Sequence, residues 1–145
     1  MASNFTIDAS VFVNAFLTHE DGHEESRALL HKLYDEGRPL LAPALLLPEV
    51  ASALARGEDD SALAQRFADT LLRLPLLTLI PLDSVLAQEA AGLAATYRLR
   101  GADAVYVAVA RRFEATLVTR DREQRERSAP VVHALTPAEA LQEDA

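Results

Sequence analysis

The stretch ADAVYVAVARRFEATLVTRD (residues 102–121) contains a complete helix-and-strand unit, and it decides the fold class. ADAVYVAVARRF follows Gly101 and is predicted to be a helix, and ATLVT (115–119) is an apolar run of strand length that ends near Asp121. The rest of the chain repeats this alternation of helices and apolar strands. Near-continuous apolar strands joined by helices are typical of parallel sheets, so we expect an α/β fold with a mostly parallel sheet and helices on both faces.

The remaining elements follow from apolar periodicity and from residues that begin or end helices. Strands are expected at residues 4–7, 39–44, 76–82 and 131–135. Helices are expected at residues 10–17, 24–37, 45–56, 59–74, and from beyond Asp83 to Leu99. Gly57 is expected to follow the end of one helix, and Thr136 is expected to cap a last one. We expect one domain over residues 1–141 and a frayed tail at 142–145.

Length and composition indicate a single soluble domain. The chain has 145 residues, of which 50% are hydrophobic, and this is enough for one domain with a substantial core. It contains no cysteine, so disulfides and thiolate metal sites are excluded, and a cytoplasmic location is expected. The N-terminal MASNFTIDAS does not have the basic and apolar regions of a signal peptide. No apolar segment approaches the ~20 residues of a membrane span, so no membrane association is expected.

Charge is distributed unevenly along the chain. The net charge is −8, whereas proteins that bind nucleic acid are usually basic. From Arg98 to Arg127, however, there are eight arginines and five acidic residues, and Asp103 and Asp121 are two of those five. The net charge therefore argues weakly against an RNA partner, and the local charge argues weakly for one.

Four acidic residues lie where apolar segments end or turn: Asp8, Glu49, Asp103 and Asp121. Each of them also has an ordinary structural interpretation. Asp8 and Asp121 follow strands, where aspartate often caps the next helix, although Ser10 would serve as a cap in place of Asp8. Glu49 and Asp103 are expected in the first turns of helices, where the helix dipole favours a negative charge.

Together, the four carboxylates predict a metal site. Carboxylates held beside buried segments are costly to bring together unless a cation compensates them. Sites with only oxygen ligands suit Mg²⁺ or Mn²⁺, as one ion or two, and such sites hydrolyse phosphodiester bonds. The hydroxyls of Ser10 and Thr119 are expected to orient a carboxylate or a water molecule. In parallel sheets, ligands bind beyond the carboxyl ends of the strands, where the strand order reverses. We therefore expect a metal-dependent nuclease.

Four blocks carry a specific family resemblance: TIDASVFVNAF, LLLPEVASALAR, LRGADAVYVAVARR and TLVTRD. In this order and spacing they resemble the acidic blocks of the PIN domain family, and the ending VVHALTPAEAL is similar to that of bacterial VapC-like toxins. The resemblance implies a three-layer α/β/α sandwich and an endoribonuclease that depends on Mg²⁺ or Mn²⁺. It also implies which residues are catalytic and bind the metal: Asp8, Glu49, Asp103 and Asp121.

The same resemblance implies partners. A VapC-like toxin acts on RNA, forms a homodimer and is blocked by a small antitoxin protein. We expect the RNA to be contacted by Arg98, Arg100 and Arg120. Members of the family usually place an apolar residue near Gln124, so the resemblance does not predict how DREQRER (121–127) packs. Four apolar positions belong either to a partner interface or to the domain's own core: Leu46, Leu63, Phe67 and Leu71.

Other functions have weaker support in the sequence. HEDGH (19–23) matches the zinc signature H-E-x-x-H, but Asp21-Gly22 favours a turn instead of the helix which that site needs. A phospho-receiver domain is also a small α/β fold, but it carries paired acids near its first strand and a late lysine, whereas the only lysine here is Lys32. A PIN-like binding module, a housekeeping RNase without an antitoxin and a DNase remain alternatives.

Overall fold

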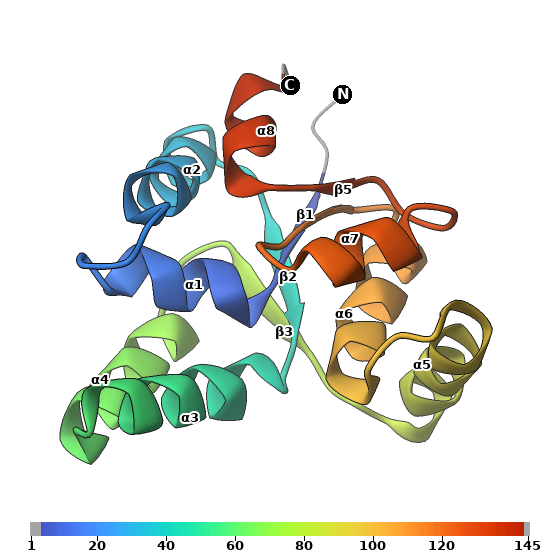
Figure 1. Cartoon of the computed structure of the whole chain (residues 1–145), viewed down its shortest axis with the longest axis horizontal. Helices are drawn as coiled ribbons and strands as arrows, with labels where there is room; N and C mark the ends of the chain where they lie inside the picture. The colour runs from blue at the N-terminus through green and yellow to red at the C-terminus, as the bar shows by residue number, and fades with distance from the viewer. Residues whose placement is uncertain (1–3, 144–145) are drawn as a thin grey trace.

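The sheet of this protein is parallel throughout. The structure is a computed structural model that describes residues 4–143. Among these residues five strands form one sheet: β1 (Phe5–Ile7), β2 (Leu40–Pro43), β3 (Leu77–Ile80), β4 (Thr116–Val118) and β5 (Ala134–Leu135). Their order is β3-β2-β1-β4-β5, and every neighbouring pair is parallel, which confirms the expected sheet (Figure 1).

Eight helices in the described part of the chain cover the sheet on both faces, as expected for an α/β/α sandwich. They are α1 (Ala9–Phe16), α2 (His23–Asp35), α3 (Leu46–Glu58), α4 (Ser61–Leu72), α5 (Ser84–Tyr97), α6 (Gly101–Arg112), α7 (Arg122–Ser128) and α8 (Pro137–Gln142). Helices α1–α4 and α8 lie on one side and α5–α7 on the other (Figure 1). Right-handed crossovers explain this division, because the winding direction reverses after β3. No helix within residues 4–143 has the length and apolar character needed to cross a membrane.

The centre of the core lies around β1, β4 and α6. All three residues of β1 and all three of β4 are buried. In α6 the residues from Ala104 to Ala110 are buried without interruption. A helix that is apolar on every side is enclosed by other elements, and α6 contacts β1, β2 and β4. This enclosure fixes α6 firmly against the middle of the sheet.

The carboxyl ends of β1 and β4 lie side by side where the strand order reverses. Ile7 is paired with Val118, so the residues that follow them, Asp8 and Thr119, are neighbours across the two strands. From β1 the chain winds outward through β2 and β3, and it then returns to place β4 and β5 on the other side. Open α/β sheets bind their ligands in the crevice at such a point.

The expected strands and helices are present, with differences at their ends. Helix α3 continues through Gly57 to Glu58, so the prediction that the helix ends before Gly57 is wrong. Ser10 does not cap α1, because the cap is Asp8, whose side chain accepts the Ser10 backbone N–H at 3.0 Å. The segment after Asp121, whose packing the sequence left open, forms α7.

The last described residues contact the body of the domain. Gln142 is the last residue of α8, so the helix enters the segment 142–145 that was expected to fray. Glu143 is paired with His133 at 2.7 Å, and its carbonyl lies 3.5 Å from Nζ of Lys32. Residues 144–145 lie outside the described part.

The apolar positions considered for a partner interface mostly face the domain's own core. Leu46 and Leu71 are fully buried. Phe67 is half-buried against the core, and its ring stacks on that of Phe16 with the centroids 4.2 Å apart. Leu63 is half-buried as well. The core interpretation is therefore correct for Leu46, Phe67 and Leu71.

The segment HEDGH does not form the helix of a zinc site. Helix α2 begins only at His23, after Gly22 in a left-handed conformation with φ of 82°. The Nδ1 atom of His23 lies 3.0 Å from the carbonyl oxygen of Asn14, and that of His19 lies 3.9 Å from Glu58. The turn predicted at Asp21-Gly22 is confirmed, and the two histidines have separate surroundings.

Candidate acidic site

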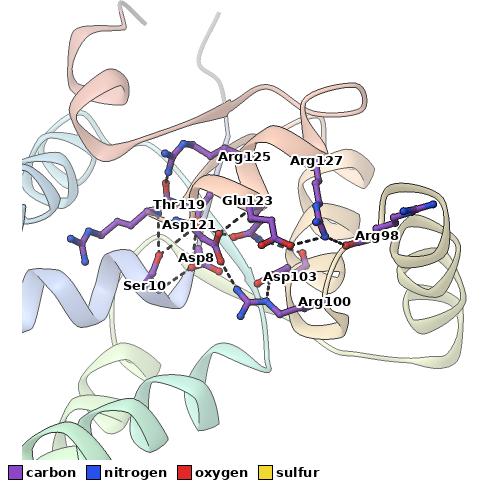
Figure 2. Close-up of polar contacts among 12 residues, drawn as sticks. Asp8, Ser10, Arg98, Arg100, Asp103, Thr119, Asp121, Glu123, Arg125 and Arg127 are labelled. Atoms are coloured by element: carbon purple, nitrogen blue, oxygen red, sulfur yellow. Dashed lines mark hydrogen bonds and ion pairs between the residues drawn. The ribbon is translucent and has the colours of Figure 1, made fainter.

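One open pocket is lined by all four acids that the sequence singled out. It has a volume of about 550 Å³, and its walls include Asp8, Glu49, Asp103 and Asp121. They come from four different elements, which the strand order and the central position of α6 bring together. Figure 2 shows Asp8, Asp103 and Asp121 grouped in this way.

Each of these acids stands at the beginning of a helix. Asp8 caps α1 and Asp121 caps α7, each through a side-chain oxygen that accepts a backbone N–H of the helix, at 3.0 and 3.2 Å. Glu49 and Asp103 lie in the first turns of α3 and α6. Four helix dipoles therefore direct their positive ends toward one pocket, which partly offsets the repulsion among the carboxylates. The ordinary structural interpretation of every acid is correct, and the acids converge as well.

Asp8 is the most enclosed of the four, at 7% exposure. Its Oδ2 atom accepts the backbone N–H of Ser10 at 3.0 Å and faces the hydroxyl of Thr119 at 3.3 Å. The hydroxyl oxygens of Ser10 and Thr119 lie 3.5 Å apart, and that of Thr119 also accepts the backbone N–H of Asp121 at 3.1 Å. Both hydroxyls that the sequence singled out therefore lie beside Asp8 (Figure 2).

Burial and mutual repulsion raise the pKa of three of the acids. Burial is the main cause for Asp8, and the charge of Asp121 adds to it, while hydrogen bonds from Ser10 and Thr119 lower the pKa. Burial likewise raises the pKa of Glu49 and of Asp103, and in both cases neighbouring carboxylates raise it further. The negative charges of these carboxylates repel one another. A cation in the pocket would relieve this repulsion and would be attracted by all of them.

An arginine bridges two of the acids. Arg100 donates through Nε to Oδ2 of Asp103 at 3.1 Å and through a terminal nitrogen to Oδ2 of Asp121 (Figure 2). These bonds raise the pKa of Arg100, mainly through Asp103. The Arg100 side chain is 71% exposed. Within residues 4–143, no three acidic or histidine side chains are close enough to hold a metal ion in this arrangement. Coordination by Asp103 and Asp121 therefore requires Arg100 to move away.

Glu49 offers a buried carboxylate oxygen. Its Oε1 is buried and makes no well-formed hydrogen bond within the described residues, although the nearby Tyr106 hydroxyl lowers the pKa of Glu49. The Tyr106 hydroxyl is buried beside it, and burial and the charge of Glu49 raise the pKa of Tyr106. A buried carboxylate oxygen is costly to leave unpaired, so a cation or water is expected against it. The residues that line the pocket include no histidine, and the chain has no cysteine, so the metal ligands available there are oxygens, which fit Mg²⁺ or Mn²⁺.

The three arginines expected to contact RNA lie in different places. Arg100 and Arg120 line the pocket, and Arg56 from α3 joins them. Arg120 is held in position because its guanidinium donates to the carbonyl oxygen of Asp21 at 2.8 Å. Arg98 is not among the residues that line the pocket, and its side chain points away from the acids (Figure 2).

Gln124 belongs to the site, although the sequence did not identify it. Its side chain is 1% exposed, and Oε1 accepts the hydroxyl of Thr119 at 2.8 Å. The helix REQRERS is polar at every position, so its inward face carries no apolar signal. One signal could have found it: members of the family usually have an apolar residue near this position, which indicates that the position is buried.

Comparisons with known proteins identify the family. The model of the PIN domain matches residues 5–129. Similar solved structures include VapBC2 from Rickettsia felis bound to a promoter DNA fragment (16% identity, TM-score 0.70, 92% of this chain and 98% of that chain). A toxin–antitoxin complex from Klebsiella pneumoniae is also similar (19% identity, TM-score 0.64, 91% of this chain and 96% of that chain). So is VapC20, a sarcin-ricin loop cleaving toxin from Mycobacterium tuberculosis (16% identity, TM-score 0.70, 89% of this chain and 97% of that chain). Curated proteins gave no significant match. The chain belongs to the PIN domain family.

Proposed function

We propose that this protein is a metal-dependent endoribonuclease that hydrolyses phosphodiester bonds of RNA. The observation that carries the proposal is the convergence of the four acids predicted from the sequence in one pocket, which Glu20 also lines, at the reversal of strand order in a PIN domain. Family membership argues against the phospho-receiver alternative. So does Lys32, which donates to the carbonyl oxygen of Leu141 at 3.1 Å and does not line the pocket.

The four acids are the residues that would hold one or two Mg²⁺ or Mn²⁺ ions. An ion bound there would supply positive charge for the phosphate and would make a water molecule acidic enough to serve as the nucleophile. Asp8 and Glu49 contribute the enclosed oxygens of the pocket. Asp103 and Asp121 contribute theirs once Arg100 has released them.

Other side chains of the pocket orient the acids and meet the substrate. Ser10 and Thr119 hold the Asp8 carboxylate in one orientation by hydrogen bonds to Oδ2. Arg100, once it has left the two carboxylates, and Arg120 place positive charge at the rim for phosphate oxygens. Attack by water needs no side-chain nucleophile, so the reaction proceeds without a covalent intermediate.

We also propose that the protein is the toxin of a toxin–antitoxin pair and acts in the cytoplasm. One of the similar structures is a toxin–antitoxin complex, and another is a sarcin-ricin loop cleaving toxin. The proposed partners are a small antitoxin protein that blocks the pocket and a second copy of this chain in a homodimer. A short open reading frame directly upstream of the gene would support this role, and its absence would favour a housekeeping RNase.

The test of the nuclease is cleavage of a panel of RNAs with Mg²⁺ or Mn²⁺ by wild type, Asp8→Asn and Asp83→Asn. Asp83 caps α5 by accepting the N–H of Leu86 at 2.8 Å, and it does not line the pocket. Asp83→Asn therefore makes the same change of charge at another helix cap. We expect Asp83→Asn to retain activity and Asp8→Asn to lose it by about 100-fold or more.

Two results would contradict the proposed reaction: equal cleavage by wild type and Asp8→Asn, or cleavage that survives EDTA. Binding of Mn²⁺ without cleavage of any RNA would instead support the PIN-like binding module.

A further inference from the structure

Gln124 is a buried polar side chain in a helix whose other side chains are mostly solvated. Only Gln124 and Ser128 are buried among the seven residues of α7. An amide enclosed in this way is costly unless its oxygen and its nitrogen find partners. In this structure both of them do, and the partners belong to the candidate acidic site.

The amide of Gln124 connects two elements of the site. Its Nε2 lies 3.4 Å from the main-chain carbonyl oxygen of Asp103, which accepts a hydrogen bond from it. This contact sets the orientation of the amide, because only the nitrogen is able to donate to a carbonyl oxygen. Oε1 therefore faces the Thr119 hydroxyl, which donates to it at 2.8 Å. The backbone N–H of Gln124 meanwhile donates to Oδ1 of Asp121 at 3.2 Å.

The Thr119 hydroxyl is the point where these contacts meet. Its oxygen accepts the backbone N–H of Asp121 at 3.1 Å and lies 3.3 Å from Oδ2 of Asp8. A hydroxyl has one proton, which Thr119 shares between Oε1 of Gln124 at 2.8 Å and Oδ2 of Asp8 at 3.3 Å, and the shorter of the two contacts is the one to the amide. The amide thereby fixes where the hydroxyl oxygen sits, and that oxygen sets the spacing between Asp8 and Asp121.

We propose that Gln124 is a positioning residue of the acidic site: it holds the Thr119 hydroxyl and, through it, fixes Asp8 and Asp121 relative to each other. Its role in metal binding rests on the proposed function. Gln124 does not line the pocket, so it acts through Thr119 and not by direct contact with metal or RNA. Groups that orient ligands in this way commonly change metal affinity when they are removed.

The test compares Gln124→Met with wild type in two measurements. Met is close to Gln in length and volume but has neither the amide oxygen nor the amide nitrogen. In metal-free protein, we expect the Asp121 amide proton to exchange with solvent about fivefold faster by NMR, which corresponds to one weakened hydrogen bond. By titration calorimetry, we expect Mn²⁺ to bind about tenfold more weakly. Ser128→Ala, at the other buried position of α7, is the matched control and should leave both values unchanged.

A double-mutant cycle distinguishes an effect of Gln124 that acts through the Thr119 hydroxyl from a general loss of packing. In a Thr119→Ala background, Gln124→Met should change Mn²⁺ affinity less than about twofold, because the two substitutions remove the same interaction. An equal loss in both backgrounds, or unchanged exchange and affinity in folded Gln124→Met, would overturn the proposal. If Gln124→Met does not fold, the test uses Thr119 instead: Thr119→Ala should weaken Mn²⁺ binding, and Thr119→Ser, which keeps the hydroxyl, should retain it. Equal Mn²⁺ affinities of Thr119→Ala and Thr119→Ser would overturn the proposal. Failure of wild type to bind Mn²⁺ would refute the proposed function, and the exchange of the Asp121 amide would still decide the role of Gln124.

Discussion

Removing the guanidinium of Arg100 should strengthen metal binding by the acidic pocket. In the structure this group bridges Asp103 and Asp121, so a cation that binds both carboxylates must displace it. Arg100→Gln removes the competing charge and keeps a polar side chain at the rim. Without Arg100, no guanidinium offsets the charges of Asp103 and Asp121, so the metal-free variant should also bind any divalent cation more readily.

The size of the effect follows from the exposure of the three side chains. Arg100 is 71% exposed, while Asp103 and Asp121 are 17% and 26% exposed. Solvent screens such pairs, and an exposed ion pair contributes about 0.2–1 kcal/mol, so the two together hinder a metal ion by about 0.5–2 kcal/mol. This corresponds to an affinity for Mn²⁺ that is about 2- to 30-fold higher in the variant.

Titration calorimetry with Mn²⁺ measures this change directly. Arg98→Gln is the matched control, because it removes the same charge from the same segment while its side chain points away from the acids (Figure 2). Equal or weaker binding by Arg100→Gln would refute the reasoning. An equal gain in Arg98→Gln would show that net charge, and not the bridge, is responsible.

Two further predictions concern single buried groups. Burial raises the pKa of Asp8, so the folded protein binds this proton more tightly than the unfolded chain, and stability falls as the pH rises above 3.8 through the raised pKa. In EDTA, Asp8→Asn should therefore melt at a higher temperature than wild type at pH 7 and at the same temperature at pH 3; a lower melting temperature at pH 7 would contradict this. Tyr106→Phe removes a buried hydroxyl that lies beside the Glu49 carboxylate and lowers its pKa, so an NMR titration of the variant should show a higher pKa for Glu49 than in wild type. An unchanged or lower pKa of Glu49 would contradict this.

The fold could be predicted because most elements carry their own local signal. Asp83 begins α5 by accepting the N–H of Leu86 at 2.8 Å, and Thr136 and Glu139 form the reciprocal capping box of α8. Gly57 was misleading, since one glycine costs a helix only about 1 kcal/mol and is often tolerated. The cap that ends helix α3 is Asp59, which adopts a left-handed conformation with φ of 50°, and Asp60 then caps α4 by accepting the N–H of Leu63 at 3.0 Å. An aspartate in that conformation is a weaker signal in the sequence than a glycine.

The acids of the site could be identified from sequence, but their contacts could not. Asp8 and Asp121 were recognisable because they follow strands, and strand ends meet where the order reverses. Arg100 has a long side chain with several directions open to it, so its bridging position depends on where Asp103 and Asp121 come together in space. Gln124 is one polar residue among others, and only the packing of α7 shows that it points inward. Local patterns specify the backbone, while such pairings depend on tertiary contacts.

Helix capping and membership of the site are compatible, although they looked like competing roles for each acid. A helix that follows a parallel strand begins at the carboxyl edge of the sheet, so its first residues face the ligand crevice. A carboxylate has two oxygens: Asp121 caps α7 with Oδ1 and pairs with Arg100 through Oδ2, while Asp8 caps α1 with Oδ2 alone. Asparagine is an equally good cap but carries no charge. Asp→Asn at either position should therefore preserve the helix and abolish the metal site, which separates the two roles of one side chain.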